Sequence, residues 1–161
     1  MTSPGDRAAL IDLLTRFASG IDTRNWTLYR SAFTDEIDLD YSSWRPESIG
    51  RWRADEWVAH GPRIFPGLTF SRHTLTNHTV TVGASGDSAS VRANVCAEHV
   101  IVEGDSTDVF TLNGYYDDRC VRTTEGWRIT GKTLVVQWCT GDVDVMRRAR
   151  ERAAELLAGN D

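Results

Sequence analysis

The fold of this 161-residue chain is decided by residues 87–126, DSASVRANVCAEHVIVEGDSTDVFTLNGYYDDRCVRTTEG. Two runs rich in β-branched and aromatic residues flank the turn cluster at residues 103–106 and predict paired strands. A strand of about 15 residues would extend about 50 Å, whereas a compact domain of this length is about 40 Å across. We therefore expect strands that curl or carry bulges, and a curled sheet encloses a concave space.

The same pattern extends outward on both sides of this stretch. Residues 68–141 hold four such segments, separated by glycine-containing turn clusters, and predict an antiparallel meander. Residues 36–42 alternate between apolar and acidic side chains and predict one further, half-buried strand. After the meander, residues 142–160 are typical of a polar helix.

The N-terminal third of the chain predicts helices. Ser3 is suited to cap a first helix and Pro4 to open it. This helix ends near Gly20 and carries an apolar stripe formed by Leu10, Leu14, Phe17 and Ile21. Short helices are expected from Asn25 to Phe33 and over residues 54–59. Helices before and after a curled sheet indicate an α+β fold in which the helices close the open side and leave a pocket.

Composition excludes several classes of protein. The chain carries 18 basic and 23 acidic residues, a net charge of −5 with no basic run, which argues against binding nucleic acid or an anionic membrane. Its longest apolar runs are far too short for a transmembrane helix, and the N-terminus lacks the pattern of a signal peptide. The cysteines are Cys96, Cys120 and Cys139. Their odd number and wide spacing indicate core residues in a reducing, cytoplasmic setting.

Four histidines are candidates for chemistry, but their spacing does not predict a metal site. His73 and His78 are five residues apart, which places them on opposite faces of a strand. No phosphate loop, dinucleotide fingerprint or zinc motif occurs in the sequence, so we expect no metal and no cofactor. His99 shares a strand face with five apolar residues and is either a core histidine or a pocket residue that positions substrate.

Other candidate side chains remain open between a structural and a functional role. The strand pattern alone leaves His73 exposed or half-buried, and Asp22 is either a helix-end aspartate or a functional carboxylate. Tyr41 is expected to point inward, where its hydroxyl needs a partner or a ligand. Asn113 lies in a run of hydrogen-bonding side chains that could face the pocket. Further candidates for an apolar pocket lining are Phe17, Trp57 and Trp138.

Five short motifs, taken in order, resemble the SnoaL-like branch of the nuclear-transport-factor-2-like superfamily. The motifs are IDTRNW (21–26), DLDYSS (38–43), RHTLTNH (72–78), GYYDDR (114–119) and GWRI (126–129). The resemblance is closest to the scytalone dehydratase and bile-acid dehydratase type, and hexachlorocyclohexane dehydrochlorinase belongs to the same group. It implies one SnoaL-like domain over residues 1–161, with a core at 6–141 and a C-terminal helix at 142–160 that acts as a lid. The implied fold is a cone, a curled mixed sheet closed by helices, assembled as a dimer or trimer.

The resemblance also implies a function. Those dehydratases use no cofactor and eliminate water or HCl with an Asp–His pair, which corresponds here to Asp22 and His73. Tyr41 matches the tyrosine that holds a water on the substrate carbonyl, and His99 and Asn113 match a pocket histidine and asparagine. Where those enzymes have a second tyrosine near the aspartate, this chain has Phe17 and Ile21.

The expected function is therefore a lyase acting on a small hydrophobic molecule, a cyclic or polyketide-like hydroxy-ketone. Because one fold hosts many activities, two alternatives stay open. The first is an isomerase or cyclase that uses the same residues. The second is a non-catalytic ligand-binding or association subunit, in which Asp22 and His73 would form a structural pair.

Overall fold

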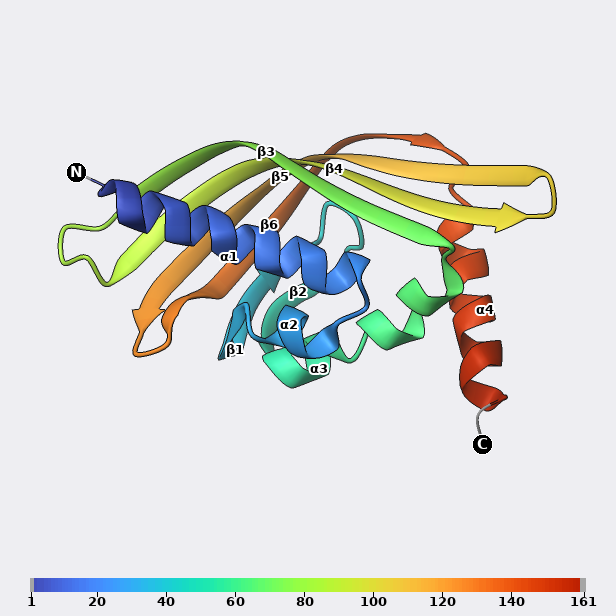
Figure 1. The fold of residues 1–161 in the computed structure, drawn as a ribbon, viewed down its shortest axis with the longest axis horizontal. Helices are drawn as coiled ribbons and strands as arrows, with labels where there is room; N and C mark the ends of the chain where they lie inside the picture. Colours follow the sequence, from blue (N-terminus) through green and yellow to red (C-terminus); the bar gives the residue numbers. More distant parts are fainter. Residues whose placement is uncertain (1, 160–161) are drawn as a thin grey trace.

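A six-stranded sheet with the order β2-β1-β6-β5-β4-β3 forms the body of the computed structural model, which describes residues 2–159. The strands are β1 (Phe33–Asp40), β2 (Ile49–Arg53), β3 (Phe70–Val82), β4 (Ser88–Glu103), β5 (Ser106–Thr123) and β6 (Gly126–Gly141). Strands β3 to β6 make the expected antiparallel meander, and β1 joins β6 in parallel, so the sheet is mixed. Figure 1 shows the long strands arching together over the first helices.

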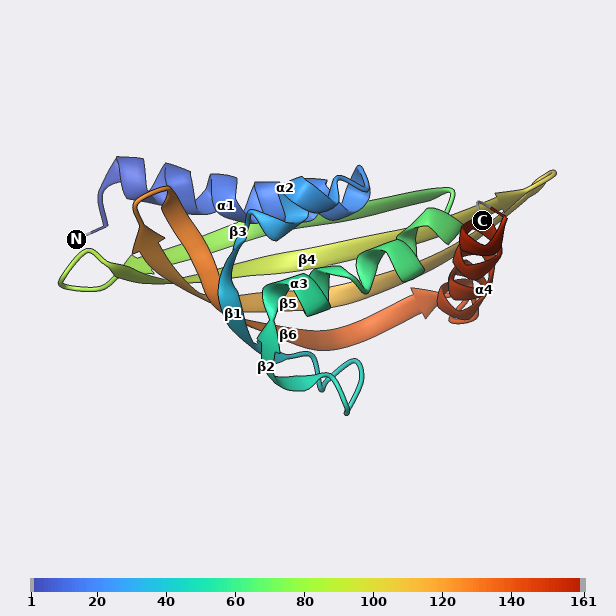
Figure 2. The same cartoon turned by 90° about the horizontal axis from the view of Figure 1, so that it is seen from below.

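The helices lie on the concave side of the sheet and at one end of it. They are α1 (Pro4–Asp22), α2 (Trp26–Arg30), α3 (Ala54–Val58) and α4 (Val145–Ala158), with 3-10 turns η1 (Gly61–Arg63) and η2 (Phe65–Gly67). The first three α-helices run beneath the long strands, while α4 stands across the end of the cone (Figures 1 and 2). The predicted α+β cone, closed by N-terminal helices and a C-terminal helix, is confirmed. Among residues 2–159, no helix is both long and apolar enough to cross a membrane.

Local signals place the first helices where the sequence predicts them. The Ser3 hydroxyl accepts a hydrogen bond from the Asp6 amide, and the stripe of α1 is buried against the sheet. The Asn25 side chain accepts from the Leu28 amide and starts α2, which ends earlier than expected, at Arg30. The strand that begins at Phe33 ends at Asp40, so Tyr41 lies just beyond it. Strand β2 is absent from the sequence prediction, because most of its residues are exposed and lack an apolar alternation.

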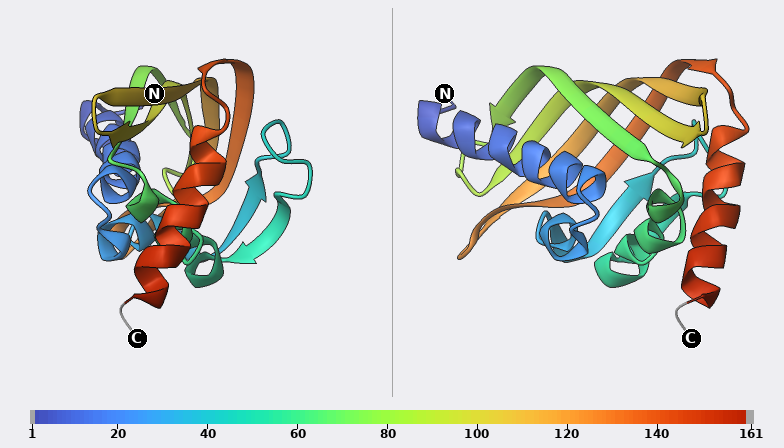
Figure 3. Two further views of the ribbon diagram at one scale, coloured as in Figure 1. Left: turned by 90° about the vertical axis from the view of Figure 1, so that its right-hand side faces the viewer. Right: turned by 45° about the vertical axis from the view of Figure 1, so that its right-hand side comes forward.

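The long strands curl as their length requires. Strand β5 has 18 residues, and its pairing with β6 shifts at Asn113/Gly114 and at Arg119/Cys120. At Gly114 a Cβ atom would lie 1.9 Å from the Val135 carbonyl oxygen, so only glycine allows the two strands to approach this closely. The irregularities bend the sheet into the trough that Figure 3 shows end-on.

A bulge in β3 overturns the expected facing of two histidines. The register with β4 shifts between Thr76 and Thr79, where Asn77 adopts a left-handed φ of 55°. The extra residue reverses the alternation, so His73 and His78 both turn toward the covered face although they are five residues apart. The prediction that His73 and His78 lie on opposite faces is therefore wrong. As a residue His73 is half-buried, which agrees with one of the two expected placements, and its side chain is only 6% exposed.

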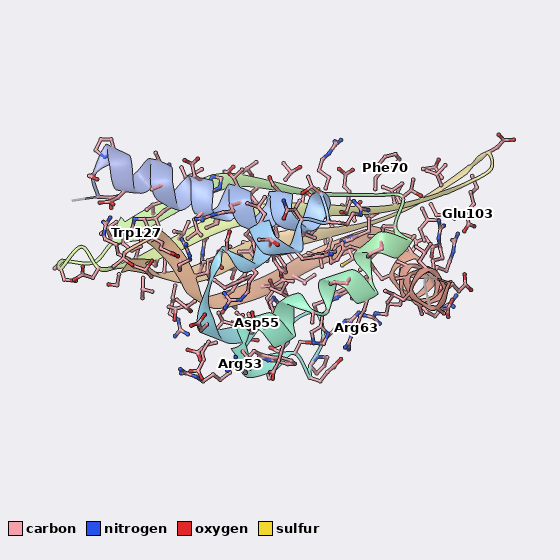
Figure 4. All side chains as sticks on the ribbon, turned by 60° about the horizontal axis from the view of Figure 1, so that its bottom comes forward. Arg53, Asp55, Arg63, Phe70, Glu103 and Trp127 are labelled. Atoms are coloured by element: carbon pink, nitrogen blue, oxygen red, sulfur yellow. The ribbon has the colours of Figure 1, made fainter. Side chains whose placement is uncertain are left out.

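Helix α4 is fixed at the end of the cone by close packing and by ion pairs. A Cβ atom at Gly67 of η2 would lie 1.9 Å from the Ala149 carbonyl oxygen, so the two backbones are in direct contact. Arg148 of α4 forms ion pairs with Asp108 at 2.7 Å and with Glu103 at 2.9 Å. Figure 4 shows Glu103 beside this helix. The helix spans Val145–Ala158 and is therefore shorter at both ends than the expected 142–160.

Candidate functional site

Asp22 and His73 meet where the end of α1 contacts edge strand β3. The Oδ1 atom of Asp22 lies 2.7 Å from Nδ1 of His73, and Oδ2 accepts a 2.7 Å hydrogen bond from the His73 amide. The carboxylate thus holds both the ring and the backbone of one residue, which fixes the imidazole in place. The side chains are 20% and 6% exposed, so the pair is largely shielded from water.

The protonation of this pair follows from its surroundings. Burial pushes the pKa of Asp22 upward, but hydrogen bonds and charge attraction from His73 outweigh it and leave the pKa below its ordinary value. An ionised carboxylate only accepts hydrogen bonds, so Nδ1 of His73 is the donor. In the neutral ring the other nitrogen, Nε2, then carries a free lone pair and is able to accept a proton.

His73 lines a cavity of about 310 Å³ between the helices and the concave face of the sheet. The wall is mostly aromatic and apolar. The lining residues are Phe17, Ile21, Tyr29, Tyr41, Trp44, Arg45, Glu47, Ser48, Trp52, Trp57, His60, Gly61, Ile64, Phe65, His73, Ala97, His99, Phe110, Leu112, Tyr116, Leu134 and Met146. Asp22 is not among them, and its described link to the cavity is its contact with His73. A cavity of this size and lining suits a small, mostly apolar ligand.

His99 is buried beside the pair and stays uncharged. Its ring packs edge-on against His73 at 5.7 Å between centroids and lies 6.1 Å from Phe65 and 5.9 Å from Phe110. Burial, with His73 close by, lowers the pKa of His99 to about 3. Nδ1 of His99 is buried without a hydrogen-bond partner of normal geometry among the described residues, and His99 lines the cavity.

Three tyrosines contribute to the cavity wall. Tyr41 follows β1, Tyr29 lies on α2, and Tyr116 lies on β5. The hydroxyls of Tyr41 and Tyr116 interact, and burial is the main cause that raises the pKa of each well above its ordinary value. The Tyr29 hydroxyl accepts a 2.9 Å hydrogen bond from Nε1 of Trp57. Tyr41 and Tyr116 are therefore neutral phenols that are able to donate hydrogen bonds to a ligand oxygen.

The structure brings most of the predicted residues together and leaves two out. Phe17 and Trp57 line the cavity together with Tyr41, His73 and His99. Asn113 does not, because on β5 the inward positions are even-numbered and Asn113 points to the opposite face. Trp138 does not either. It lies beyond the bulge near the end of β6 and is 57% exposed. The prediction that these two contact substrate in this cavity is wrong.

Tyr29 and Tyr116 are cavity residues that the sequence reasoning missed. Tyr116 shares its strand face with Phe110 and Leu112, so the alternation that places Asn113 outside also places Tyr116 inside. That signal is present in the sequence. Tyr29 has no comparable signal, since α2 spans only five residues. Within residues 2–159, no group of three or more histidine, cysteine or acidic side chains is arranged to hold a metal ion.

Comparison with known proteins places this geometry among relatives of the same fold. Over 125 residues, 77% of this chain and 80% of its relative, the sequence is 33% identical to the uncharacterized protein Rv2910c of Mycobacterium tuberculosis. A solved structure from Novosphingobium aromaticivorans, described as a candidate aromatic ring hydroxylase, is 27% identical with a TM-score of 0.76. The match covers 91% of this chain and 99% of that one.

Two more distant structures are similar in fold alone. A candidate scytalone dehydratase from N. aromaticivorans is 16% identical with a TM-score of 0.69, covering 84% of this chain and 87% of that one. The hexachlorocyclohexane dehydrochlorinase LinA-type3 from Novosphingobium barchaimii is 20% identical with a TM-score of 0.67, covering 86% and 91%. The family model of the SnoaL-like domain matches residues 5–133. This chain therefore belongs to the SnoaL-like family of the nuclear-transport-factor-2-like superfamily.

Proposed function

We propose that the protein is a cofactor-independent dehydratase that removes a proton next to a carbonyl group and eliminates water. The observation that carries the proposal is the 2.7 Å contact of Asp22 with Nδ1 of His73, in which His73 lines a largely apolar cavity. Two proteins of the same fold have names that denote eliminations, a dehydratase and a dehydrochlorinase. That likeness supports the reaction class.

In the proposed reaction Nε2 of His73 is the base. It takes the proton from the carbon next to the substrate carbonyl, while Asp22 stabilises the imidazolium that forms. Positioned proton transfer of this kind contributes about 10²–10⁴-fold to a rate. The negative charge moves to the carbonyl oxygen, and the Tyr41 and Tyr116 hydroxyls are the donors proposed to meet it.

The second half of the reaction returns the same proton. The imidazolium of His73 donates it to the β-hydroxyl group, the carbon–oxygen bond breaks, and a carbon–carbon double bond forms. One C–H and one C–O bond are exchanged for a double bond and a water molecule, so the step balances without an oxidant or reductant. A base that also serves as the acid requires both groups on one face of the substrate, which predicts syn elimination.

The lining favours a flat, cyclic or polyketide-like hydroxy-ketone as substrate. Rings of Tyr41 and Trp57 lie 5.0 Å apart between centroids, and those of Trp52 and Trp57 lie 6.0 Å apart, so aromatic faces and edges are available for stacking. Arg45 and Glu47 are the charged residues of the lining. A mostly apolar cavity with few polar groups binds the ring system by burial and orients it by those groups.

A screen of cyclic β-hydroxy ketones for loss of water tests the proposal. With a substrate in hand, His73→Ala and Asp22→Asn are each expected to lower kcat by about 10²–10⁴-fold with little change in melting temperature. His78→Ala is the matched control, since His78 lies on the same strand and does not line the cavity.

Three outcomes would contradict the dehydratase assignment. Turnover that survives both substitutions excludes the pair as the catalytic base. A product of unchanged mass identifies an isomerase. A large loss of melting temperature in both variants, without turnover of any compound by the wild type, assigns the pair to the fold and favours a ligand-binding or association subunit.

A further inference from the structure

A buried ion pair lies directly behind the cavity wall. Lys132 of β6 and Asp118 of β5 are paired across the two strands, and Nζ of Lys132 lies 2.8 and 3.0 Å from the two carboxylate oxygens. Both side chains are 0% exposed. Neither residue lines the cavity that contains His73.

A buried ion pair of this kind contributes little net free energy to holding two strands together. Removing two charges from water costs free energy that their attraction only partly returns, and apolar residues of similar volume often serve a fold as well or better. Burial acts against both charges here: it raises the pKa of Asp118 and lowers that of Lys132, and their mutual attraction opposes both shifts. The position of the Lys132 ammonium indicates a second role for the pair, besides its contribution to stability.

The ammonium of Lys132 contacts two rings of the cavity wall. Nζ lies 3.6 Å from the ring centroid of Tyr116 and 3.9 Å from that of Phe17, both within cation–π distance. Tyr116 and Phe17 also pack edge-on against each other at 5.5 Å. The cation is thus held between a carboxylate on one side and two aromatic faces on the other, and one of those rings carries a hydroxyl at the cavity.

We propose that the Lys132–Asp118 pair is a positioning element that fixes Tyr116 and strengthens its hydroxyl as the second donor, beside Tyr41, to a substrate oxygen that becomes negative. This proposal rests on the proposed function, because the oxygen in question is the carbonyl oxygen of the substrate, which becomes negative in the proposed dehydration. A cation on the face of a phenol draws electron density from the ring, which makes the O–H a better donor. Asp118 holds the cation at that face.

The test replaces both charges together, because removing one leaves the other buried without a partner. The variant Asp118→Leu/Lys132→Met keeps the volume apolar, and Asp118→Asn/Lys132→Gln keeps polar groups without charge. The matched control is Arg92→Met/Asp117→Leu, which removes an exposed cross-strand ion pair at 2.6 Å. Asp117 is the neighbour of Asp118 on the opposite face of β5.

The readout uses 4-nitro-1-naphtholate, a flat aromatic oxyanion that is ionised at neutral pH, with naphthalene as the uncharged comparison. We expect both charge-free variants to bind naphtholate about tenfold more weakly than the wild type, the loss that corresponds to one weakened hydrogen bond. The affinity of these variants for naphthalene is expected to stay unchanged. The control variant Arg92→Met/Asp117→Leu is expected to bind naphtholate as tightly as the wild type. In a Tyr116→Phe background the same double substitutions should have no further effect on naphtholate binding, because the donor is already gone. With a substrate, kcat should fall about 10- to 100-fold while KM changes little.

The results separate this proposal from the dehydratase assignment. Naphtholate binding does not require turnover, so loss of the dehydratase assignment by the His73→Ala test leaves the binding comparison intact. The proposal is overturned if a folded charge-free variant binds naphtholate as tightly as the wild type, or if its loss is equally large in the Tyr116→Phe background. Failure of both variants to fold would assign the pair to stability alone and would also overturn it.

Discussion

His99 is expected to make the protein less stable as the pH falls from neutrality. Burial lowers the pKa of this imidazole from 6.5 to about 3. Between these two values the unfolded chain binds a proton on His99 and the native protein does not, so the free energy of unfolding rises with pH in this interval. The contribution is fully present above pH 6.5 and is progressively lost below it.

The magnitude follows from the size of the shift. Each pH unit within the interval changes the free energy of unfolding by about 1.4 kcal/mol. At pH 5 the native state has therefore lost about 2 kcal/mol through His99 alone, because this pH lies about 1.5 units below the unfolded-state value. A loss of that size is a large fraction of the total stability of a typical domain.

The assay compares urea unfolding of the wild type and His99→Phe at pH 7 and pH 5. Phenylalanine has nearly the shape of the imidazole and no titrating group, and its neighbours Phe65 and Phe110 are already aromatic. We expect the wild type to lose about 2 kcal/mol more than the variant between the two pH values. His60→Phe, a substitution at an exposed residue, controls for the added phenyl group. Equal losses in the wild type and His99→Phe would refute the reasoning.

Three further predictions concern stability and reactivity. Gly67→Ala places a Cβ atom against the Ala149 carbonyl, so α4 has to shift, and thermal unfolding should reveal a loss of about 1–3 kcal/mol; an unchanged melting temperature would contradict the close contact. Asn25→Ala removes the cap of α2 and should cost about 1 kcal/mol in urea unfolding, whereas a cost near zero would mean that the cap bond is dispensable. Cys139 is exposed while burial raises the pKa of Cys120 to about 12, so dithionitrobenzoate should label Cys139 at once and Cys120 only on unfolding; rapid labelling of Cys120 in the native protein would be inconsistent with its burial.

The sequence predicts those parts of the fold that depend on residues close together in the chain. The helix caps at Ser3 and Asn25, the apolar stripe of α1 and the four long strands are local patterns, and they lie where expected. The curl follows from strand length alone. Strand β2 could not be predicted, because it is a short exposed strand that is held by pairing with β1 rather than by its own apolar pattern.

The candidate site depends on contacts that no local pattern contains. The alternation in β3 fails at Asn77, where one extra residue reverses the facing of every side chain on one side of it. For that reason periodicity does not bury His73, and only the family resemblance pairs it with Asp22. On β5 the alternation is unbroken from Phe110 to Tyr116, and it favours Tyr116 over Asn113 as a cavity residue.

The partners in the Asp22–His73 contact are 51 residues apart in the chain, one at the end of a helix and the other on a strand at the edge of the sheet. The base proposed for the reaction therefore requires both elements, since neither the isolated helix nor the isolated strand contains the Asp22–His73 contact. It comes into being when α1 docks against β3. In a preparation in which this docking is incomplete, the undocked molecules are expected to be inactive and not merely to have a lower kcat. The specific activity is then proportional to the fraction of native molecules.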